Sequence, residues 1–367
     1  MADKIRVGIV GATVTTGGSG WGARAHVPAI KALPDYELKA VCTAHEDTAK
    51  ASAAEFGAAL AFHDVNDMVA RNDIDLAVVC VKVPGHRDLV LSAIEAGKDV
   101  FCEWPLGANL AEAEEMAARA RARSVRTIVG LQGRSDPTLN YVRELVNDGY
   151  IGDVLACSMV SFGSGATAER PIARAWSSDR ANGANTLTIS GGHSIDGLCF
   201  CLGEFAEVSG KVATQVRQWR ASDSGAMVSV SSPDNVLVSG VLESGALASI
   251  HIASVPFNGS GFRFEIYGRE GTLLVSGGST NIGGNRILGA KGSESLTEMP
   301  VPDRFIIVPE GTPKGQAFNV AQAYTRYADA RNAGEDFEPG FDLAVRRHRL
   351  LEAMEKASET GRAVPVS

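Results

Sequence analysis

The strongest constraint on the fold of this chain is a regular alternation of apolar strands and helical patterns from residue 4 to about residue 130. Strand-like runs occur at 4–12, 36–44, 74–83, 98–105 and 126–134. The run IDLAVVCVKV at 74–83 is almost continuously apolar, as in strands that are buried on both faces of a parallel sheet. The alternation therefore predicts a doubly wound α/β domain with a parallel sheet at residues 1–134.

Beyond residue 135 the pattern changes to one more helix followed by long runs with strand-like alternation. The runs cover 153–164, 205–219, 235–254 and 262–277. They predict a second, α+β domain at 135–367 with an open, mostly antiparallel sheet. Two helices are expected near the end, at 315–334 and 341–361, and could pack back on the first domain. Residues 278–296 have the composition of a mobile, glycine-rich excursion.

Composition excludes several classes of function. The net charge of −8 argues against a nucleic-acid-binding surface or contact with an anionic membrane. No apolar run approaches the roughly 18 residues that a membrane span needs. The N-terminus runs straight into the first strand, so we expect a cytoplasmic protein without a signal peptide. The six cysteines lack the spacing of metal ligands, and we expect buried, reduced thiols and no metal site.

A glycine-rich turn links the first strand to the first helix. In VGIVGATVTTGGSGWGARAH the glycines are Gly8, Gly11, Gly17, Gly18, Gly20 and Gly22. Glycine allows a sharp turn and lets a pyrophosphate approach the amides at the helix N-terminus. The loop is longer than in the plain G-x-G-x-x-G pattern, but its place between strand and helix predicts a dinucleotide site.

The second strand ends in AVCTAHED, where NAD-preferring sites usually carry an acid that bonds the ribose hydroxyls. Thr43 holds that place, and His45 follows two residues later. Since neither an acid nor an arginine stands there, both NAD and NADP remain open. Alternatively, the two residues only begin a solvated loop.

Several segments, in order and at suitable separations, resemble the family of glucose–fructose oxidoreductase and inositol dehydrogenase. They are VGIVGA…ARAHVPAI, IDLAVVCVKVPGH, AGKDVFCEWPL, LQGR…P…LVNDGYIGDV and GGHSIDGL. The branch of the fungal repressor of galactose genes and its bacterial oxidoreductase-like relatives is the most similar one, with V-K-V-P-x-H, E-W-P, L-Q-G-R and G-H-x-I-D. The resemblance implies a Rossmann domain that binds NAD or NADP, and a second domain whose open sheet often joins subunits in a homodimer or homotetramer.

The resemblance implies a set of cofactor-binding residues at the carboxyl ends of the strands. They are Gly11, Ala12, Thr13, Gly20, Trp21, Gly22, Thr43, His45, Val81, Pro84, His86, Glu103, Trp104 and Gln132. Trp104 departs from the family, which usually has a lysine between the glutamate and the proline. Its indole does not titrate, but it could wall the nicotinamide or simply pack beside Pro105.

A second departure concerns the Asp-x-x-x-His motif that supplies a general acid/base in many members. Counted from Asp196, the fourth residue is Phe200, which cannot move a proton. His193 lies three residues before Asp196, so on a helix the two would share a face. His193 is our first candidate for acid/base chemistry, with Asp196 orienting it. The alternatives are a buried histidine that bonds backbone and a structural aspartate.

Three further residues are candidates at the same site. Lys82, at the end of an apolar strand, could replace the missing lysine or could point into solvent. Arg134 and Trp176 could hold a hydroxylated substrate, or could be surface or packing residues.

Three functions remain open from the sequence. The first is an NAD(P)-dependent dehydrogenase or reductase acting on a sugar-like or other hydroxylated small molecule. The second is a non-catalytic, nucleotide-binding regulator resembling the galactose-gene repressor, with a protein partner. The third is an elimination or hydrolysis that begins with transient oxidation by the cofactor.

Overall fold

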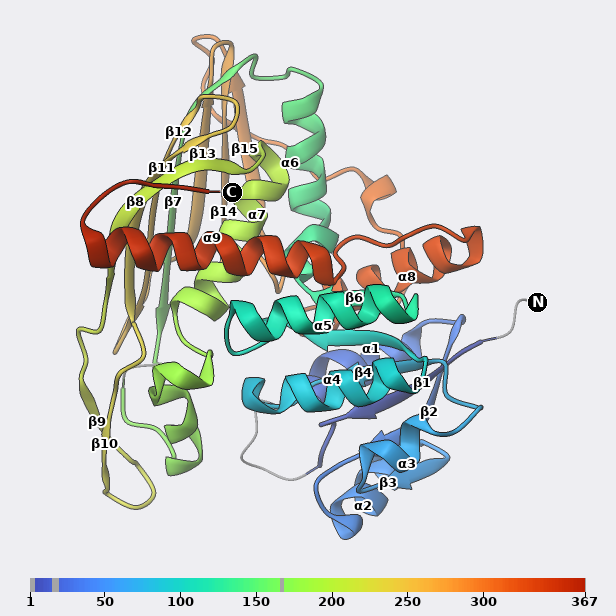
Figure 1. The fold of residues 1–367 in the computed structure, drawn as a ribbon. Helices are drawn as coiled ribbons and strands as arrows, with labels where there is room; N and C mark the ends of the chain where they lie inside the picture. Colours follow the sequence, from blue (N-terminus) through green and yellow to red (C-terminus); the bar gives the residue numbers. More distant parts are fainter. Residues whose placement is uncertain (1–3, 15–19, 166–167, 367) are drawn as a thin grey trace. The chain divides into compact units, whose positions relative to one another are not determined.

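The computed structural model describes residues 4–14, 20–165 and 168–366. The chain forms two compact units (Figure 1). Unit 1 contains Met1–Leu131 and Ile307–Arg346, and unit 2 contains Gln132–Ile306 and Arg347–Ser367. Within the described ranges, no helix combines the length and the apolar character needed to cross a membrane.

Unit 1 is built on a six-stranded parallel sheet. Its strands are β1 (Ile5–Val10), β2 (Tyr36–Cys42), β3 (Leu60–Phe62), β4 (Leu76–Val79), β5 (Asp99–Glu103) and β6 (Thr127–Gly130). Their order is β3-β2-β1-β4-β5-β6. Strands β1 to β3 are added toward one edge of the sheet and β4 to β6 toward the other, so the topological switch point lies between β1 and β4. This is the doubly wound order of dinucleotide-binding folds, and it confirms the predicted Rossmann domain.

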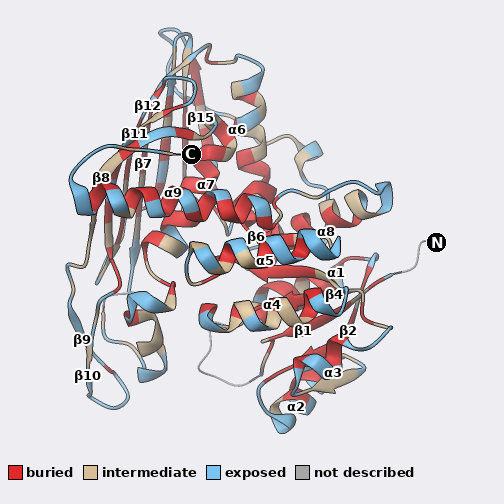
Figure 2. Ribbon diagram, viewed as in Figure 1, coloured by how far each residue is buried: buried red, intermediate tan, exposed pale blue. Residues whose placement is uncertain are grey.

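Helices cover both faces of this sheet. They are α1 (Val27–Ala32), α2 (Glu46–Phe56), α3 (Val65–Val69), α4 (His86–Glu95), α5 (Leu110–Arg123) and α8 (Gln316–Ala333). Helix α1 packs against α8, and α4 packs against α5. One core cluster joins the sheet to α1 and α8, and includes the fully buried Ile9, Ile30 and Tyr324. Figure 2 shows the sheet strands buried, whereas α4 and α5 expose their outer sides.

Unit 2 is built on a nine-stranded sheet in the order β16-β15-β14-β13-β7-β12-β11-β8-β17. Its long strands are β7 (Val154–Ser164), β8 (Phe205–Ala213), β11 (Asn235–Leu242), β12 (Leu247–Val255), β13 (Gly261–Gly268), β14 (Gly271–Gly277) and β15 (Arg286–Lys291). The short strands are β16 (Thr297–Glu298) and β17 (Val364–Pro365). Among the described strands of this sheet, only β7 and β12 pair in parallel, so the predicted open, mostly antiparallel sheet is confirmed.

In the described part of unit 2, the α-helices that lie wholly or partly within the unit are α6 (Pro137–Asn147), α7 (Gly192–Leu202) and α9 (Phe341–Thr360), of which α9 crosses the unit boundary at Arg347. Helix α7 is buried along almost its whole length (Figure 2). The six cysteines are all buried, as expected.

Two kinds of expectation for this unit were wrong. The runs at 235–254 and 262–277 are not single strands, because each folds into an antiparallel pair, β11 with β12 and β13 with β14. The run at 205–219 is not one strand either, because β8 ends at Ala213 and β9 (Gln218–Arg220) pairs instead with β10 (Met227–Ser229). The chain turns there because the amides of Gln215 and Val216 bond the carboxylate of Asp234 at 2.9 and 2.7 Å.

The second wrong expectation was a mobile excursion at 278–296. Residues 286–291 form β15, which pairs with β14, and Ile287 is 1% exposed. Gly283 and Gly284 have φ of 85° and 75°, so their glycine character serves the turn between β14 and β15.

Candidate functional site

The glycine-rich turn lies at the carboxyl end of β1. Gly11 has φ of +98°, and a Cβ atom there would lie 2.3 Å from the carbonyl oxygen of Cys80. The turns after β1 and β4 therefore touch through backbone atoms, which only glycine permits. Predicted Ala12 and Thr13 follow in this turn, whereas Gly17 and Gly18 lie outside the described residues.

A π-helical turn, η1 (Gly22–His26), opens the first helix. Gly20 and the half-buried Trp21 precede it, and a Cβ atom on Gly22 would come within 3.0 Å of Cα of Ala12. The helix thus starts directly against the turn, where its first amides can hold a pyrophosphate. Together with the switch point between β1 and β4, this cradle fits a dinucleotide.

Thr43 lies at the tip of β2, where NAD-preferring sites usually have an acidic residue. The Thr43 hydroxyl lies 3.0 Å from the carbonyl oxygen of His45 and 2.6 Å from the hydroxyl of Thr48, so it closes its own turn. His45 is exposed and precedes α2. This turn gives no charge-based reason to reject a 2′-phosphate, and the choice between NAD and NADP stays open.

The turns after β4 and β5 are tied together by His86. Its Nδ1 lies 2.9 Å from the carbonyl oxygen of Pro105, and its Nε2 lies 3.1 Å from that of Val81. Burial lowers the pKa of this histidine, which is 1% exposed. Its ring nitrogens therefore face backbone, and a direct contact with the cofactor stays a prediction. Lys82 and Pro84, in the turn beside it, are exposed.

Glu103 ends β5, and Trp104 follows it. Oε1 of Glu103 lies 2.7 Å from Nε2 of His26, a residue that is 0% exposed. Trp104 is 5% exposed. This burial fits both expectations, that the indole packs beside Pro105 or that it lies against the nicotinamide ring of the cofactor.

In unit 2, Asp196 on α7 forms ion pairs with two arginines. Arg134 donates from Nε at 2.9 Å and from Nη2 at 2.9 Å, and the fully buried Arg347 donates from Nε at 3.2 Å. Arg347 also donates to Glu204 at 2.8 and 3.0 Å. Burial alone would raise the pKa of Glu204, but the hydrogen bonds and charge of Arg347 lower it. This geometry favours Asp196 and Arg134 as a structural pair, and their roles toward His193 and substrate stay predictions.

His193 stands in the first turn of α7 and is 8% exposed. It follows a second π-helical turn, η6 (Leu187–Gly191), and such turns are frequent at functional sites. Phe200 lies under two guanidinium groups, 5.2 Å from that of Arg134 and 4.6 Å from that of Arg143. A phenylalanine at this place is therefore a packing partner of arginines.

The spacing of the family motif has a second register that the sequence reading missed. If the motif's histidine is His193, its aspartate position falls four residues earlier, on Ile189, which is 38% exposed. In that register the histidine is retained and the aspartate is lost.

The remaining unit 2 candidates lie on short helical turns. Gln132, 2% exposed, and Arg134 belong to η3 (Gln132–Ser135). Trp176 is half-buried on η4 (Ile172–Ser178), where its carbonyl accepts a bond of 2.5 Å from Asn182. Its place at a substrate stays a prediction.

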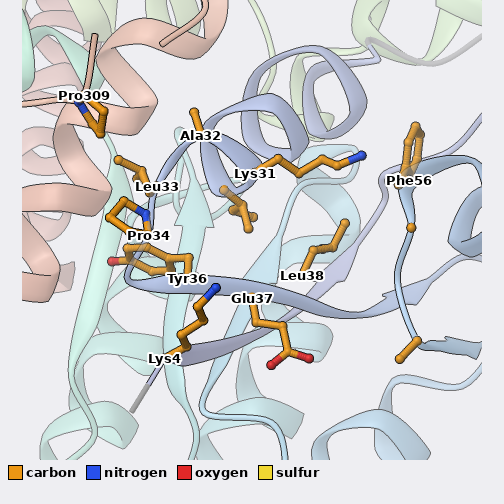
Figure 3. A pocket seen from close by; sticks show the side chains of 13 residues that line it. Lys4, Lys31, Ala32, Leu33, Pro34, Tyr36, Glu37, Leu38, Phe56 and Pro309 are labelled. Atoms are coloured by element: carbon orange, nitrogen blue, oxygen red, sulfur yellow. The ribbon is translucent and has the colours of Figure 1, made fainter. Parts of the chain in front are cut away.

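A separate depression of about 630 Å³ lies on unit 1 (Figure 3). Its lining includes Lys4, Lys31, Tyr36, Phe56 and Pro309. Lys4 precedes β1 and Tyr36 begins β2, so the depression lies at the amino ends of these strands. Dinucleotides bind at the carboxyl ends, so this depression is not the cofactor site.

Comparison with known proteins identifies both parts of the chain. Residues 5–131 match the model described as "Oxidoreductase family, NAD-binding Rossmann fold", and residues 137–277 match "Gal80p, C-terminal domain". The dehydrogenase aclE of Aspergillus oryzae is 38% identical over 56% of this chain and 57% of its own length. The galactose/lactose metabolism regulatory protein GAL80 of Saccharomyces cerevisiae is 28% identical over 75% of this chain and 67% of its own.

A solved structure has the same fold over the whole chain. Levoglucosan dehydrogenase in complex with NADH and L-sorbose covers 100% of both chains with a TM-score of 0.85 and 19% identity. The two family models and the relatives confirm the resemblance found in the sequence motifs, and the model that matches residues 5–131 supports the expected nicotinamide cofactor.

Proposed function

We propose that the protein is an NAD(P)-dependent dehydrogenase or reductase, because residues 5–131 match the model of an oxidoreductase family with an NAD-binding Rossmann fold. Its substrate is a sugar-like or otherwise hydroxylated small molecule. The observation that carries the proposal is the position of His193, in the first turn of a buried helix directly after a π-helical turn. Support for the substrate class comes from levoglucosan dehydrogenase, which shares the fold.

When bound, the nicotinamide would accept a hydride from a carbinol carbon, or return one to a carbonyl carbon. The chain itself has to move the hydroxyl proton. An imidazole nitrogen can both accept and donate a proton, so His193 would take this proton during oxidation and return it during reduction. Lys82 is the second candidate for this step, because it lies in the turn at the carboxyl end of β4.

The test is a turnover assay with matched variants. Purified protein is mixed with each oxidised and reduced nucleotide and with a panel of sugars, inositols, uronates and hydroxylated aromatics, and absorbance at the reduced nicotinamide band is followed. His193→Asn should lower kcat roughly 100-fold or more, as removal of an acid/base group does, with little change in nucleotide affinity. Lys82→Met is the matched variant of the second candidate.

Two outcomes would contradict this assignment. Tight nucleotide binding without turnover of any compound would reject the dehydrogenase. A near-normal rate in His193→Asn together with a large loss in Lys82→Met would move the proton transfer to the lysine.

A second function, a nucleotide-binding regulator, has one specific observation in its favour. Residues 137–277 match the C-terminal domain of Gal80p, a regulatory protein, and the chain has Trp104 where the wider family has lysine. Binding without turnover in the assay above is the result that this second function requires.

A further inference from the structure

Three polar side chains form a buried chain of hydrogen bonds inside unit 1. His26 Nδ1 lies 2.7 Å from the hydroxyl of Tyr324, and His26 Nε2 lies 2.7 Å from Oε1 of Glu103. His26 and Tyr324 are 0% exposed, and Glu103 is 9% exposed. The three residues come from η1, α8 and β5, which are far apart in the sequence.

The chemistry of the partners fixes the protons. A carboxylate only accepts hydrogen bonds, so Nε2 of His26 carries a hydrogen and donates to Glu103. Burial raises the pKa of Tyr324 well above its usual range, so its hydroxyl stays protonated and donates to Nδ1. Both ring nitrogens of His26 thus have a partner inside the core.

Each end of the chain of bonds is itself held in place. Tyr324 accepts a bond of 2.6 Å at its carbonyl from the hydroxyl of Tyr36, and its ring packs at 5.2 Å from Phe101. A Cβ atom on Gly130 would lie 2.7 Å from Oε2 of Glu103, so β6 leaves room for the carboxylate only because it has glycine there.

This chain of hydrogen bonds through Tyr324, His26 and Glu103, called the bridge below, connects the two halves of the nucleotide-binding sheet. His26 ends η1, whose first residue packs on the glycine-rich turn in the half formed by β1 to β3. Glu103 ends β5 in the other half, and Trp104 follows it. In a doubly wound fold each half holds one mononucleotide of the dinucleotide. A fully bonded buried network makes one relative arrangement of its elements much more stable than others.

We propose that His26 is a positioning residue for the dinucleotide, which fixes the β5 turn relative to the glycine-rich turn so that both halves of the nucleotide bind at once. The proposal rests on nucleotide binding and does not require catalysis. Loss of the bridge should therefore weaken the whole dinucleotide more than a fragment that occupies only the adenine half.

The test compares the binding of NADH and of ADP by isothermal titration calorimetry. Tyr324→Phe removes one hydroxyl, and His26→Leu removes both bonds. Each should raise the Kd for NADH roughly 3- to 10-fold, the range that one net hydrogen bond implies, and leave the Kd for ADP unchanged. His26→Gln keeps one donor and one acceptor and should restore part of the loss.

Tyr327→Phe is the matched control, because it removes a buried tyrosine hydroxyl that bonds Asp99 at 2.5 Å, in the same core but outside the bridge. It should lower the melting temperature without changing the ratio of the two Kd values. If Tyr324→Phe shifted NADH and ADP in parallel, or changed neither, the positioning role would be wrong. Binding of neither nucleotide by the unaltered protein would overturn it as well.

Discussion

At the scale of single residues, Asp196 is the carboxylate on which two buried guanidinium groups depend. Asp196→Asn keeps the shape but removes the charge, which leaves Arg134 and Arg347 with less compensation in a buried site. We expect the free energy of unfolding to fall by about 3 kcal/mol, the scale for breaking a buried ion pair. Urea unfolding at neutral pH measures it.

Glu298→Gln is the control for this change, because its ion pair with Arg286 is exposed. That substitution should alter stability by less than about 0.5 kcal/mol. Equal effects of the two substitutions would show that the Asp196 cluster contributes no more than a surface pair.

Thr43 gives a second prediction at this scale, about the choice of cofactor. Thr43→Asp would place a carboxylate at the tip of β2, where it can bond the ribose hydroxyls of NADH but repels a 2′-phosphate. The affinity for NADPH should fall roughly tenfold or more, while that for NADH stays the same or rises. Calorimetric titration of both nucleotides measures the ratio, and Thr43→Asn controls for shape. A parallel loss of both affinities would contradict the assignment of this turn to the ribose.

The sequence identified polar residues at strand and helix ends, but not their partners. Arg134 was expected at a substrate, yet its guanidinium pairs with Asp196, 62 residues away. Arg347 and Glu204 were not singled out, because they lie 143 residues apart in the sequence and meet only in the folded chain. His26 lay inside a quoted motif without being noticed, since the motif does not show that Tyr324 and Glu103 approach it.

At the scale of elements, hydrophobic periodicity predicted well wherever a segment packs on one face. The alternation in 4–130 and the long strands of the second sheet gave the right classes because burial there repeats with the period of the element. Periodicity failed at 278–296, where glycine content outweighed the alternation around Ile287, and at 205–219, where one aspartate turns the chain. The π-helical form of η1 and η6 has no signal in the sequence that we can identify.

Helix α9 supplies the prediction at this scale, because it carries a buried histidine. Burial lowers the pKa of His348 to about 4, against an ordinary value of 6.5. Between these two values the unfolded chain binds a proton that the folded chain does not, so stability is present above pH 6.5 and is lost as the pH falls toward 4. One such proton contributes about 1.4 kcal/mol per pH unit.

The unfolding free energy of the His348→Leu protein should therefore decline less steeply between pH 6.5 and 4.5. The slope against pH should fall by up to about 1.4 kcal/mol per pH unit, which corresponds to one proton. Denaturant titrations at several pH values measure this slope. The exposed His63 provides the control, because His63→Gln should leave the slope as it is. A His348→Leu protein with an unchanged slope would show that another group controls acid unfolding.

At the scale of the whole molecule, the chain does not divide once into two consecutive pieces. Ile307–Arg346 belongs with the first 131 residues, and α8 from this segment supplies Tyr324 to the core around β1 and β5. A contribution of this kind is hard to see in sequence, because local periodicity shows that a helix exists but not which sheet it covers.

The final prediction concerns assembly through the second sheet. Helices α6 and α7 lie on one face of that sheet, and the residues that point to the other face include the leucines Leu237 and Leu247, 53% and 61% exposed. Ser158, Ser239 and Ser249 form a row of small residues across three strands of the same face. A flat face with small residues and exposed leucines suits packing against the same face of a second copy.

We therefore expect a homodimer or a tetramer built from such dimers, detectable by light scattering coupled to gel filtration. The double variant Leu237→Glu/Leu247→Glu should dissociate it, because two like charges per face would meet their copies across a two-fold axis. Nucleotide binding should survive, since these residues lie in unit 2 and the glycine-rich turn lies in unit 1. Leu155→Glu controls for a general loss of solubility. Leu155 is also an exposed leucine, at 49%, but it lies three positions from Ser158 on β7 and therefore points to the opposite face of the sheet. A monomeric unaltered protein, or a double variant with unchanged mass, would show that this face is not the interface.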